Sequence, residues 1–232
     1  MPKTKIVVIS GAGISAESGL STFRGSGGLW EGYDIQEVAS PQGWETDTET
    51  VLQFYNLRRR QAAEAKPNKA HKALADLEKQ FEVVIITQNV DDLHERAGSN
   101  NVMHLHGELR KARSEKNESL VIDIGSDPIK LGDLAEDGAQ LRPHVVWFGE
   151  MVPMIEPAAM EVAEADILIV VGTSLVVYPA AGLIHYAKTG IPKYIIDPSE
   201  PQLLDQDGWF HYRENAGTGV KKLAEKLKKE IS

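Results

Sequence analysis

A glycine-rich segment directly after an apolar run could bind a phosphate group. The segment "GAGISA" spans residues 11–16 and follows the run "KIVVIS" at residues 5–10, which fits the G-x-G-x-x-G/A pattern of a dinucleotide site. Glycines let the backbone approach a pyrophosphate, and the N–H groups of a following helix can point at the anion. The sequence therefore predicts a nucleotide site, although a glycine-rich turn without a ligand would have the same composition.

The residues after this segment do not continue as they do in a dehydrogenase. In that class a second strand follows quickly and ends in an acidic residue about 20 residues on, which holds the ribose. Here the polar stretch "STFRGSGGLWEGYD" follows, and the next clear strand is "EVVIIT" at residues 82–87. Hydride transfer by a simple dehydrogenase is therefore disfavoured.

Further polar side chains follow apolar runs, at strand ends where open sheets bind ligands. Gln88, Asn89 and Asp91 in "TQNVDDLH" suit an amide or a ribose, or a helix cap. His106 in "HLHGE" could by itself be a structural histidine. "GTSLVVYPAA" at residues 172–181 could form a second phosphate or ribose loop, or merely cap a helix.

Composition excludes several classes of function. The chain has 232 residues, a net charge of -9 and a pI of about 5.3, which argues against nucleic acid as a partner. No apolar run approaches the ~20 residues that span a bilayer. The first strand begins by residue 5, so we expect no targeting segment and a cytoplasmic protein. The absence of cysteine rules out disulfides and thiolate metal sites.

Apolar runs alternate with helical stretches, which predicts an α/β fold with a Rossmann-like, doubly wound parallel sheet. We predict strands at 5–10, 82–87, 144–148, 166–172 and 193–197, and helices at 48–64, 69–79, 156–164, 179–189 and 217–230.

Two stretches interrupt this alternation. Residues 24–66 contain glycines and helices but no predicted strand, and residues 110–141 are polar and acidic. We expect one catalytic domain over 1–232 in which these two stretches form a small inserted part. The large part would comprise approximately 1–23, 67–109 and 142–232, and the cleft between the parts would be the ligand site.

Taken together, the motifs resemble one family closely. "GAGISAESGLSTFRG", "TQNVDDLHERAG", "HLHGEL", "RPHVVWFGE" and "GTSLVVYPAA" occur in the order found in the sirtuins, which are NAD-dependent protein-lysine deacylases. The resemblance runs from about residue 5 to 220 and is greatest to the short bacterial members.

The resemblance implies residues for each step. It assigns His106 and Asn89 to catalysis, and the edge of "VVWFGE" to binding of the substrate peptide through Val146, Phe148 and Gly149. Asp197 stands where sirtuins often carry Asn. The residues that it assigns to NAD are Gly11, Ala12, Gly13, Ser15, Thr22, Phe23, Arg24, Trp30, Gln88, Asn89, Asp91, Gly172, Thr173, Ser174 and Ala216.

The implied reaction consumes NAD. The carbonyl oxygen of the acyl-lysine attacks C1′ of the nicotinamide ribose, and His106 acts as general base on a ribose hydroxyl. A histidine suits this role because its ordinary pKa of ~6.5 lies near the working pH. The products would be free lysine, nicotinamide and O-acyl-ADP-ribose, and the partners would be acyl-lysine proteins.

"FYNLRRRQ" refines the expected substrate. In the sirtuin class that removes acidic acyl groups, a Tyr-x-x-Arg pair lines the acyl pocket, and Tyr55 and Arg58 match it. A guanidinium and a phenol suit a succinyl or malonyl carboxylate. We interpret Arg59 and Arg60 as a solvated basic helix face.

The chain departs from the family at the zinc site. Most sirtuins hold a structural zinc with four cysteines in the region that matches 110–141, and Ser114 stands near the place of the first one. We expect no zinc, and we expect packing to stabilise the region through Leu120, Val121, Ile122, Ile124, Ile129, Leu131 and Leu134.

Two other functions stay open at this point. A NAD glycohydrolase or ADP-ribosyltransferase shares the glycosidic step, but it needs neither the Tyr55–Arg58 pair nor the peptide edge. A NAD-binding regulatory module without turnover would not need His106 in its motif.

Overall fold

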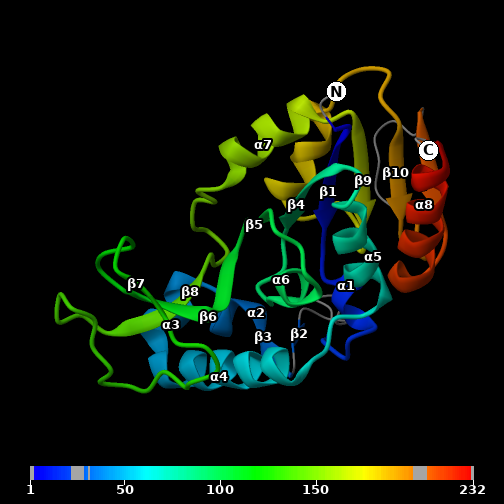
Figure 1. Cartoon of the computed structure of the whole chain (residues 1–232). Helices are drawn as coiled ribbons and strands as arrows, with labels where there is room; N and C mark the ends of the chain where they lie inside the picture. Colours follow the sequence, from blue (N-terminus) through cyan, green and yellow to red (C-terminus); the bar gives the residue numbers. More distant parts are fainter. Residues whose placement is uncertain (1–2, 22–28, 31, 201–207, 231–232) are drawn as a thin grey trace.

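A six-stranded parallel sheet forms the larger part of the protein (Figure 1). The structure is a computed structural model that describes residues 3–21, 29–30, 32–200 and 208–230, and for 29 and 30 only the backbone. The strand order is β11-β10-β9-β1-β4-β5. These strands are β1 (Lys5–Ser10), β4 (Glu82–Thr87), β5 (Val102–His104), β9 (Ile167–Val171), β10 (Lys193–Ile196) and β11 (Trp209–Tyr212).

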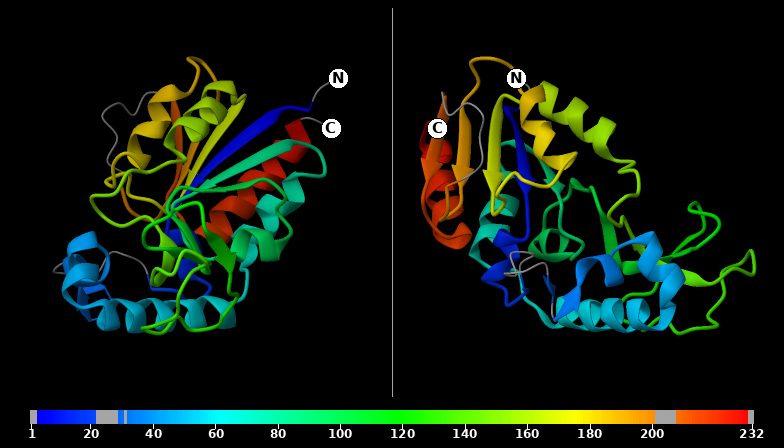
Figure 2. Two further views of the ribbon diagram at one scale, coloured as in Figure 1. Left: turned by 90° about the vertical axis from the view of Figure 1, so that its left-hand side faces the viewer. Right: turned by 180° about the vertical axis from the view of Figure 1, so that it is seen from behind.

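Helices cover both faces of this sheet, which explains why its strands are apolar without alternation. Ile6 and Val8 of β1 pack under α5 (Lys69–Leu77) and α8 (Ala216–Glu230). Val7 and Ile9 face α7 (Ile155–Glu164) and the 3₁₀ helix η1 (Ala180–Tyr186). Figure 2 shows the sheet between these two layers.

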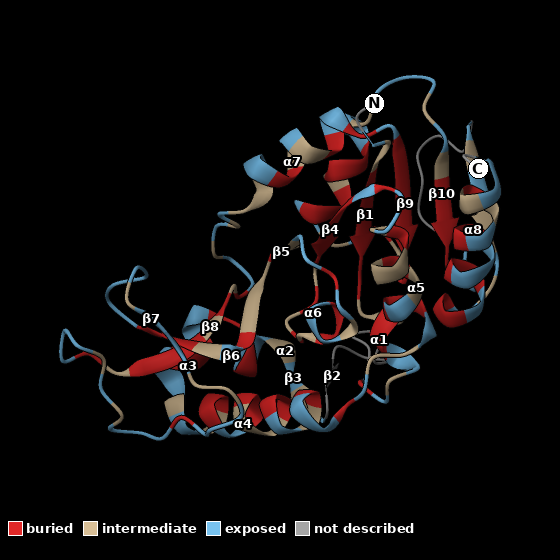
Figure 3. Ribbon diagram, in the orientation of Figure 1, coloured by how far each residue is buried: buried red, intermediate tan, exposed pale blue. Residues whose placement is uncertain are grey.

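A smaller part lies beyond the carboxyl ends of the main strands (Figure 1). Its antiparallel sheet has the order β7-β6-β8 and packs on the long helix α4. The buried face of α4 in Figure 3 turns toward this core. The elements are the hairpin β2 (Leu29–Trp30) and β3 (Tyr33–Asp34), helices α2 (Ile35–Val38), α3 (Pro41–Thr46) and α4 (Thr48–Glu64), and strands β6 (Gly107–Ser114), β7 (Val121–Asp123) and β8 (Leu141–Val145).

The predicted fold class is confirmed, with the strands at 5–10 and 82–87 and the helix at 48–64 at their predicted bounds. The strand predicted at 144–148 is wrong. It lies at Leu141–Val145, in the antiparallel sheet, where Pro143 is tolerated because β8 is an edge strand. The β2–β3 hairpin also contradicts the expectation of no strand in 24–66.

The predicted boundaries between the large part and the small part stay a prediction. The boundary between residues 109 and 110 falls inside β6, which pairs with β8 of the small sheet from Gly107 onward. Within the described residues, no helix is long and apolar enough to cross a bilayer.

The predicted packing of residues 110–141 is mostly wrong. Ile129 is buried, but Val121, Ile122, Leu131 and Leu134 are exposed, because β7 is a short edge strand and the loops after it extend away from the core. Hydrophobic burial therefore contributes less to this region than the sequence indicated.

Hydrogen bonds around Ser114 connect the turns of this region instead. The buried Ser114 hydroxyl donates to Asp137 over 2.7 Å and accepts from the backbone N–H groups of Lys116 and Asn117, both at 3.1 Å. The other Asp137 oxygen accepts from the N–H of Ala139. One serine and one carboxylate thus join two turns.

We expect that metal removal leaves the protein intact. In the described ranges, no group of three or more His, Cys, Asp or Glu side chains could hold a metal ion. Elemental analysis should find no stoichiometric zinc, and a chelator should change neither the melting temperature nor the activity, because no thiolate is present to hold zinc. About one tightly bound zinc per chain would contradict this expectation.

Candidate active site

A cavity of about 440 Å³ lies between the carboxyl ends of the main strands and the small part. This volume is in the ordinary range for ligand sites. Loops after β1, β4 and β9 contribute to its wall, as do α4 and the segment after β8. The predicted site residues that line it are Gly11, Ala12, Gly13, Ser15, Tyr55, Arg58, Gln88, Asn89, Asp91, His106, Val146, Phe148, Gly149, Gly172, Thr173 and Ser174.

The other predicted site residues do not line it. Thr22, Phe23 and Arg24 and the Trp30 side chain lie outside the described residues. Ala216 begins α8 and is buried in the core beneath that helix. Ala216 does not line the cavity, so its predicted contact with the adenine of NAD stays a prediction.

The glycines of the cavity let two loops pack backbone to backbone. Gly172 has φ +64°, and a Cβ there would lie 2.3 Å from the nitrogen of Ile14. A Cβ on Gly13 would lie 2.7 Å from the Cα of Gly172, and one on Gly11 2.7 Å from the Cβ of Thr173. Any side chain at these positions would push the ends of β1 and β9 apart.

The same packing gives several N–H groups of the first loop a partner within the protein. Helix α1 (Gly13–Ala16) is only one turn long. Gly11 and Gly13 donate to the carbonyls of Val171 and Gly172, and Ile14 and Ser15 donate within the loop. These four N–H groups are therefore paired within the protein, and the binding of a pyrophosphate by this loop stays a prediction.

A chain of hydrogen bonds orders the polar side chains. The Asn89 amide donates to the Ser15 hydroxyl over 3.1 Å, and that hydroxyl donates to Asp91 over 3.0 Å. Gln88 donates to the Thr173 hydroxyl over 3.3 Å. Burial raises the pKa of Asp91, although the bonds from Leu93 and Ser15 act in the opposite direction. The arrangement fixes the amide and carboxyl groups before any ligand arrives.

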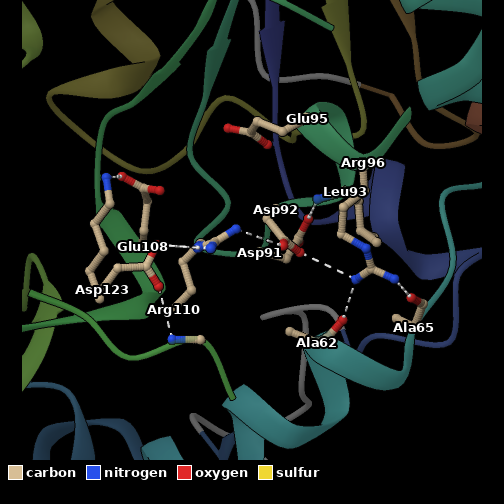
Figure 4. Close-up of polar contacts among 12 residues, drawn as sticks. Ala62, Ala65, Asp91, Asp92, Leu93, Glu95, Arg96, Glu108, Arg110 and Asp123 are labelled. Atoms are coloured by element: carbon tan, nitrogen blue, oxygen red, sulfur yellow. Dashed lines mark hydrogen bonds and ion pairs between the residues drawn. The ribbon is translucent and has the colours of Figure 1, made fainter. Parts of the chain in front are cut away.

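Charged groups next to Asp91 connect the two parts of the protein (Figure 4). Asp92 accepts from Arg96 and lies 3.7 Å from Arg110 of β6. Arg96 also donates to the carbonyls of Ala62 and Ala65 at the end of α4. The turn that carries Asp91 is thereby attached to both the long helix and the small sheet.

The backbone carbonyl of Gln88 determines the tautomer of His106. Its Nδ1 lies 3.0 Å from that oxygen, and a carbonyl can only accept, so Nδ1 carries the proton and Nε2 has the lone pair. Burial lowers the pKa of His106, and the bond to Gln88 raises it less. His106 is therefore neutral near pH 7 and can accept a proton.

His104 and Glu95 hold the backbone at Asn89, a role that the sequence did not predict. One ring nitrogen of His104 lies 3.1 Å from the Asn89 carbonyl and the other 2.7 Å from Glu95. Burial lowers the pKa of His104, but the bond and charge of Glu95 reverse this, so the net direction is upward. His104 is the first histidine of "HLHGE", two residues before His106, and this pairing of histidines was the signal in the sequence.

Tyr55 and Arg58 lie on the cavity side of α4, both nearly inaccessible to solvent. The interpretation of Arg59 as solvated is wrong. Arg59 is buried and donates to the Leu109 carbonyl over 2.6 Å and to Asn56 over 2.7 Å, so it attaches α4 to β6. Burial lowers the pKa of Arg59 to about 10. Arg60 is exposed, as predicted.

The segment that is predicted to bind the substrate peptide follows β8 and is not itself part of a strand. β8 ends at Val145, and residues 146–149 follow it along the cavity. The N–H of Val146 donates to the His106 carbonyl and that of Phe148 to the Ala39 carbonyl. A peptide could therefore pair only with other backbone groups of this segment.

Comparison with known proteins identifies the family. The Sir2 family profile matches residues 11–179. A protein of Helicobacter pylori strain J99, described as an NAD-dependent protein deacylase, is 55% identical over 222 residues, which cover 96% of this chain and 94% of the relative. The protein belongs to the Sir2 family.

Solved structures agree with this assignment. The structure of a Sir2 homologue in complex with NAD superposes with a TM-score of 0.87 at 42% identity, covering 99% of this chain and 91% of the other. A Sir2 protein in complex with a peptide and NAD+ gives 0.78 at 30% identity, covering 98% and 93%.

Proposed function

We propose that the protein removes acetyl, succinyl and malonyl groups from lysine side chains of other proteins. As a Sir2-family enzyme it is an NAD-dependent protein deacylase, the activity described for the Helicobacter relative. The acyl groups and the roles of individual residues are the new elements of the proposal.

The cavity residues fit NAD. The close contact of the loops at Gly13 and Gly172 leaves room along the strand ends for an extended ligand. Asn89, Asp91 and Ser15 offer fixed donors and acceptors for the nicotinamide and its ribose. When bound, NAD supplies an electrophilic ribose carbon whose leaving group is nicotinamide.

His106 carries the catalytic part of the proposal. Its neutral ring has an Nε2 lone pair and lines the cavity, so it can take a proton from a ribose hydroxyl. Asn89 is held by Ser15 and through its carbonyl by His104. A side chain positioned in this way can orient a reacting group with little loss of entropy on binding.

Tyr55 and Arg58 carry the substrate part. An acidic acyl group must lose water as it enters the cavity, which is costly without a cation. Arg58 can pair with its carboxylate, and the Tyr55 hydroxyl can add one hydrogen bond. Both residues line the same cavity as His106.

A product assay tests the proposal. The protein is mixed with NAD and acetyl-, succinyl- or malonyl-lysine peptide, and nicotinamide and free lysine are measured. Equal amounts of both products, formed only with acyl peptide, support deacylation. Nicotinamide released without free lysine would instead show a glycohydrolase or transferase, and no release at all would show a binding module.

The pH dependence of the reaction should reflect His106. Because burial lowers the pKa of His106 below 6.5, the base stays neutral down to that pH. We expect kcat/KM for the acetyl peptide to be constant through pH 7 and to fall as the pH drops below 6.5. A pH profile of kcat/KM measures this, and an acid limb centred above pH 7 would contradict it.

A further inference from the structure

The Tyr55 hydroxyl receives a hydrogen bond from a group that can only donate. The indole Nε1 of Trp147 lies 3.0 Å from the Tyr55 oxygen, and both side chains are buried. Since an indole N–H has no lone pair, the phenol oxygen must be the acceptor. The Tyr55 proton is then available for another partner in the cavity.

Neighbouring groups fix the position of Trp147. Its backbone N–H donates to Glu150 over 2.8 Å, and the Arg142 guanidinium lies 3.3 Å from the centre of its ring. Arg142 and Glu150 pair through both carboxylate oxygens at 2.7 and 3.1 Å. The ring of Trp44 packs on the indole with centroids 5.6 Å apart.

The direction of the Tyr55 hydroxyl matters for an acidic acyl group. A carboxylate needs a donor, whereas the lone pairs of a phenol would repel it. Burial raises the pKa of Tyr55 well above its ordinary value, so the proton is present throughout the working range. An acetyl group has no carboxylate and would gain nothing from this arrangement.

We propose that Trp147, held by Arg142 and Glu150, is a positioning residue that makes Tyr55 a hydrogen-bond donor and so favours acidic acyl groups. The inference rests on the proposed acidic-acyl activity. It assigns a role in selectivity to Arg142, Trp147 and Glu150 of "RPHVVWFGE", a segment in which only Val146, Phe148 and Gly149 were expected to contact the substrate.

The test is the ratio of kcat/KM for matched succinyl- and acetyl-lysine peptides. Trp147→Phe keeps an aromatic ring but removes the donor, and should lower the ratio at least fivefold, mainly through a higher KM for the succinyl peptide. In a Tyr55→Phe background the same change should lower the ratio less than twofold, because Trp147 acts through Tyr55.

Trp209→Phe is the matched control. It removes an indole N–H on β11, in the main sheet, and Trp209 does not line the cavity. The control should leave the ratio within twofold of the wild type. The proposal would be overturned if both tryptophan variants changed the ratio equally. It would also be overturned if Trp147→Phe lowered the ratio at least fivefold in the Tyr55→Phe background.

A variant that does not fold and a wild type that removes no succinyl groups lead to different conclusions. If the melting curve shows that Trp147→Phe does not fold, Glu150→Gln replaces it, since it keeps an acceptor but weakens the contact with Arg142. It should lower the ratio two- to threefold, and an unchanged ratio overturns the inference. If the wild type removes no succinyl groups, the acidic-acyl function fails and the inference fails with it.

Discussion

His106→Tyr should lose deacylation by a factor on the order of 100 to 10,000, the usual contribution of a general base. A phenol has an ordinary pKa of about 10 and cannot accept a proton near pH 7. The loss should be the same for acetyl and succinyl peptides, because the base acts on a ribose hydroxyl and not on the acyl chain. Release of free lysine under saturating NAD measures it.

The fold should persist in this variant. The substitution removes the hydrogen bond from the His106 ring to the Gln88 carbonyl, which costs about 0.5–1.5 kcal/mol. We therefore expect a melting temperature only a few degrees lower. His185→Tyr is the matched control, since His185 is exposed on η1 and does not line the cavity. Undiminished deacylation by folded His106→Tyr would remove His106 from the mechanism.

Arg58→Met should lower desuccinylation at least tenfold and deacetylation much less. Methionine retains much of the length and the apolar stem but lacks the cation, so an entering carboxylate loses its water without compensation. A charged hydrogen bond contributes on the order of 1.5–3 kcal/mol, or roughly 10- to 100-fold. The measurement is kcat/KM for both peptides in the wild type and the variant.

Arg60→Met is the matched control for this substitution. Arg60 lies two residues further along α4 but is exposed and does not line the cavity. It should change neither activity more than twofold. If Arg58→Met lowered both activities equally, Arg58 would support the helix or the NAD site, and the acidic-acyl proposal would be wrong.

The strands of the main sheet could be predicted because both of their faces are buried. Ile6 to Ile9 have no solvent-facing positions, so the run is apolar throughout and cannot be mistaken for a surface strand. The strands of the small sheet could not be predicted in this way. β6 carries Arg110 and Lys111 between buried positions and buries a further arginine, Arg113. Its pairing with β8 depends on contacts far apart in sequence.

The residues of the candidate site also differ in whether the sequence could predict them. Gln88, Asn89 and His106 follow strands or precede a glycine, so local pattern points to them. Trp147 and Arg142 carry no such signal, because an aromatic in a β-like run is usually core and a lone arginine is usually solvated. Their role depends on the distance from Trp147 to Tyr55, 92 positions apart in the chain.

The position of β1 constrains the order of folding. β1 begins at residue 5, yet its two neighbours are β4, at residues 82–87, and β9, at residues 167–171. During synthesis the first strand must therefore wait for most of the chain before its second edge is covered. Contacts of such long range slow folding and leave an apolar edge exposed to other chains. We expect the nucleotide loops, which interlock through Gly13 and Gly172, to be completed only after β9 has left the ribosome.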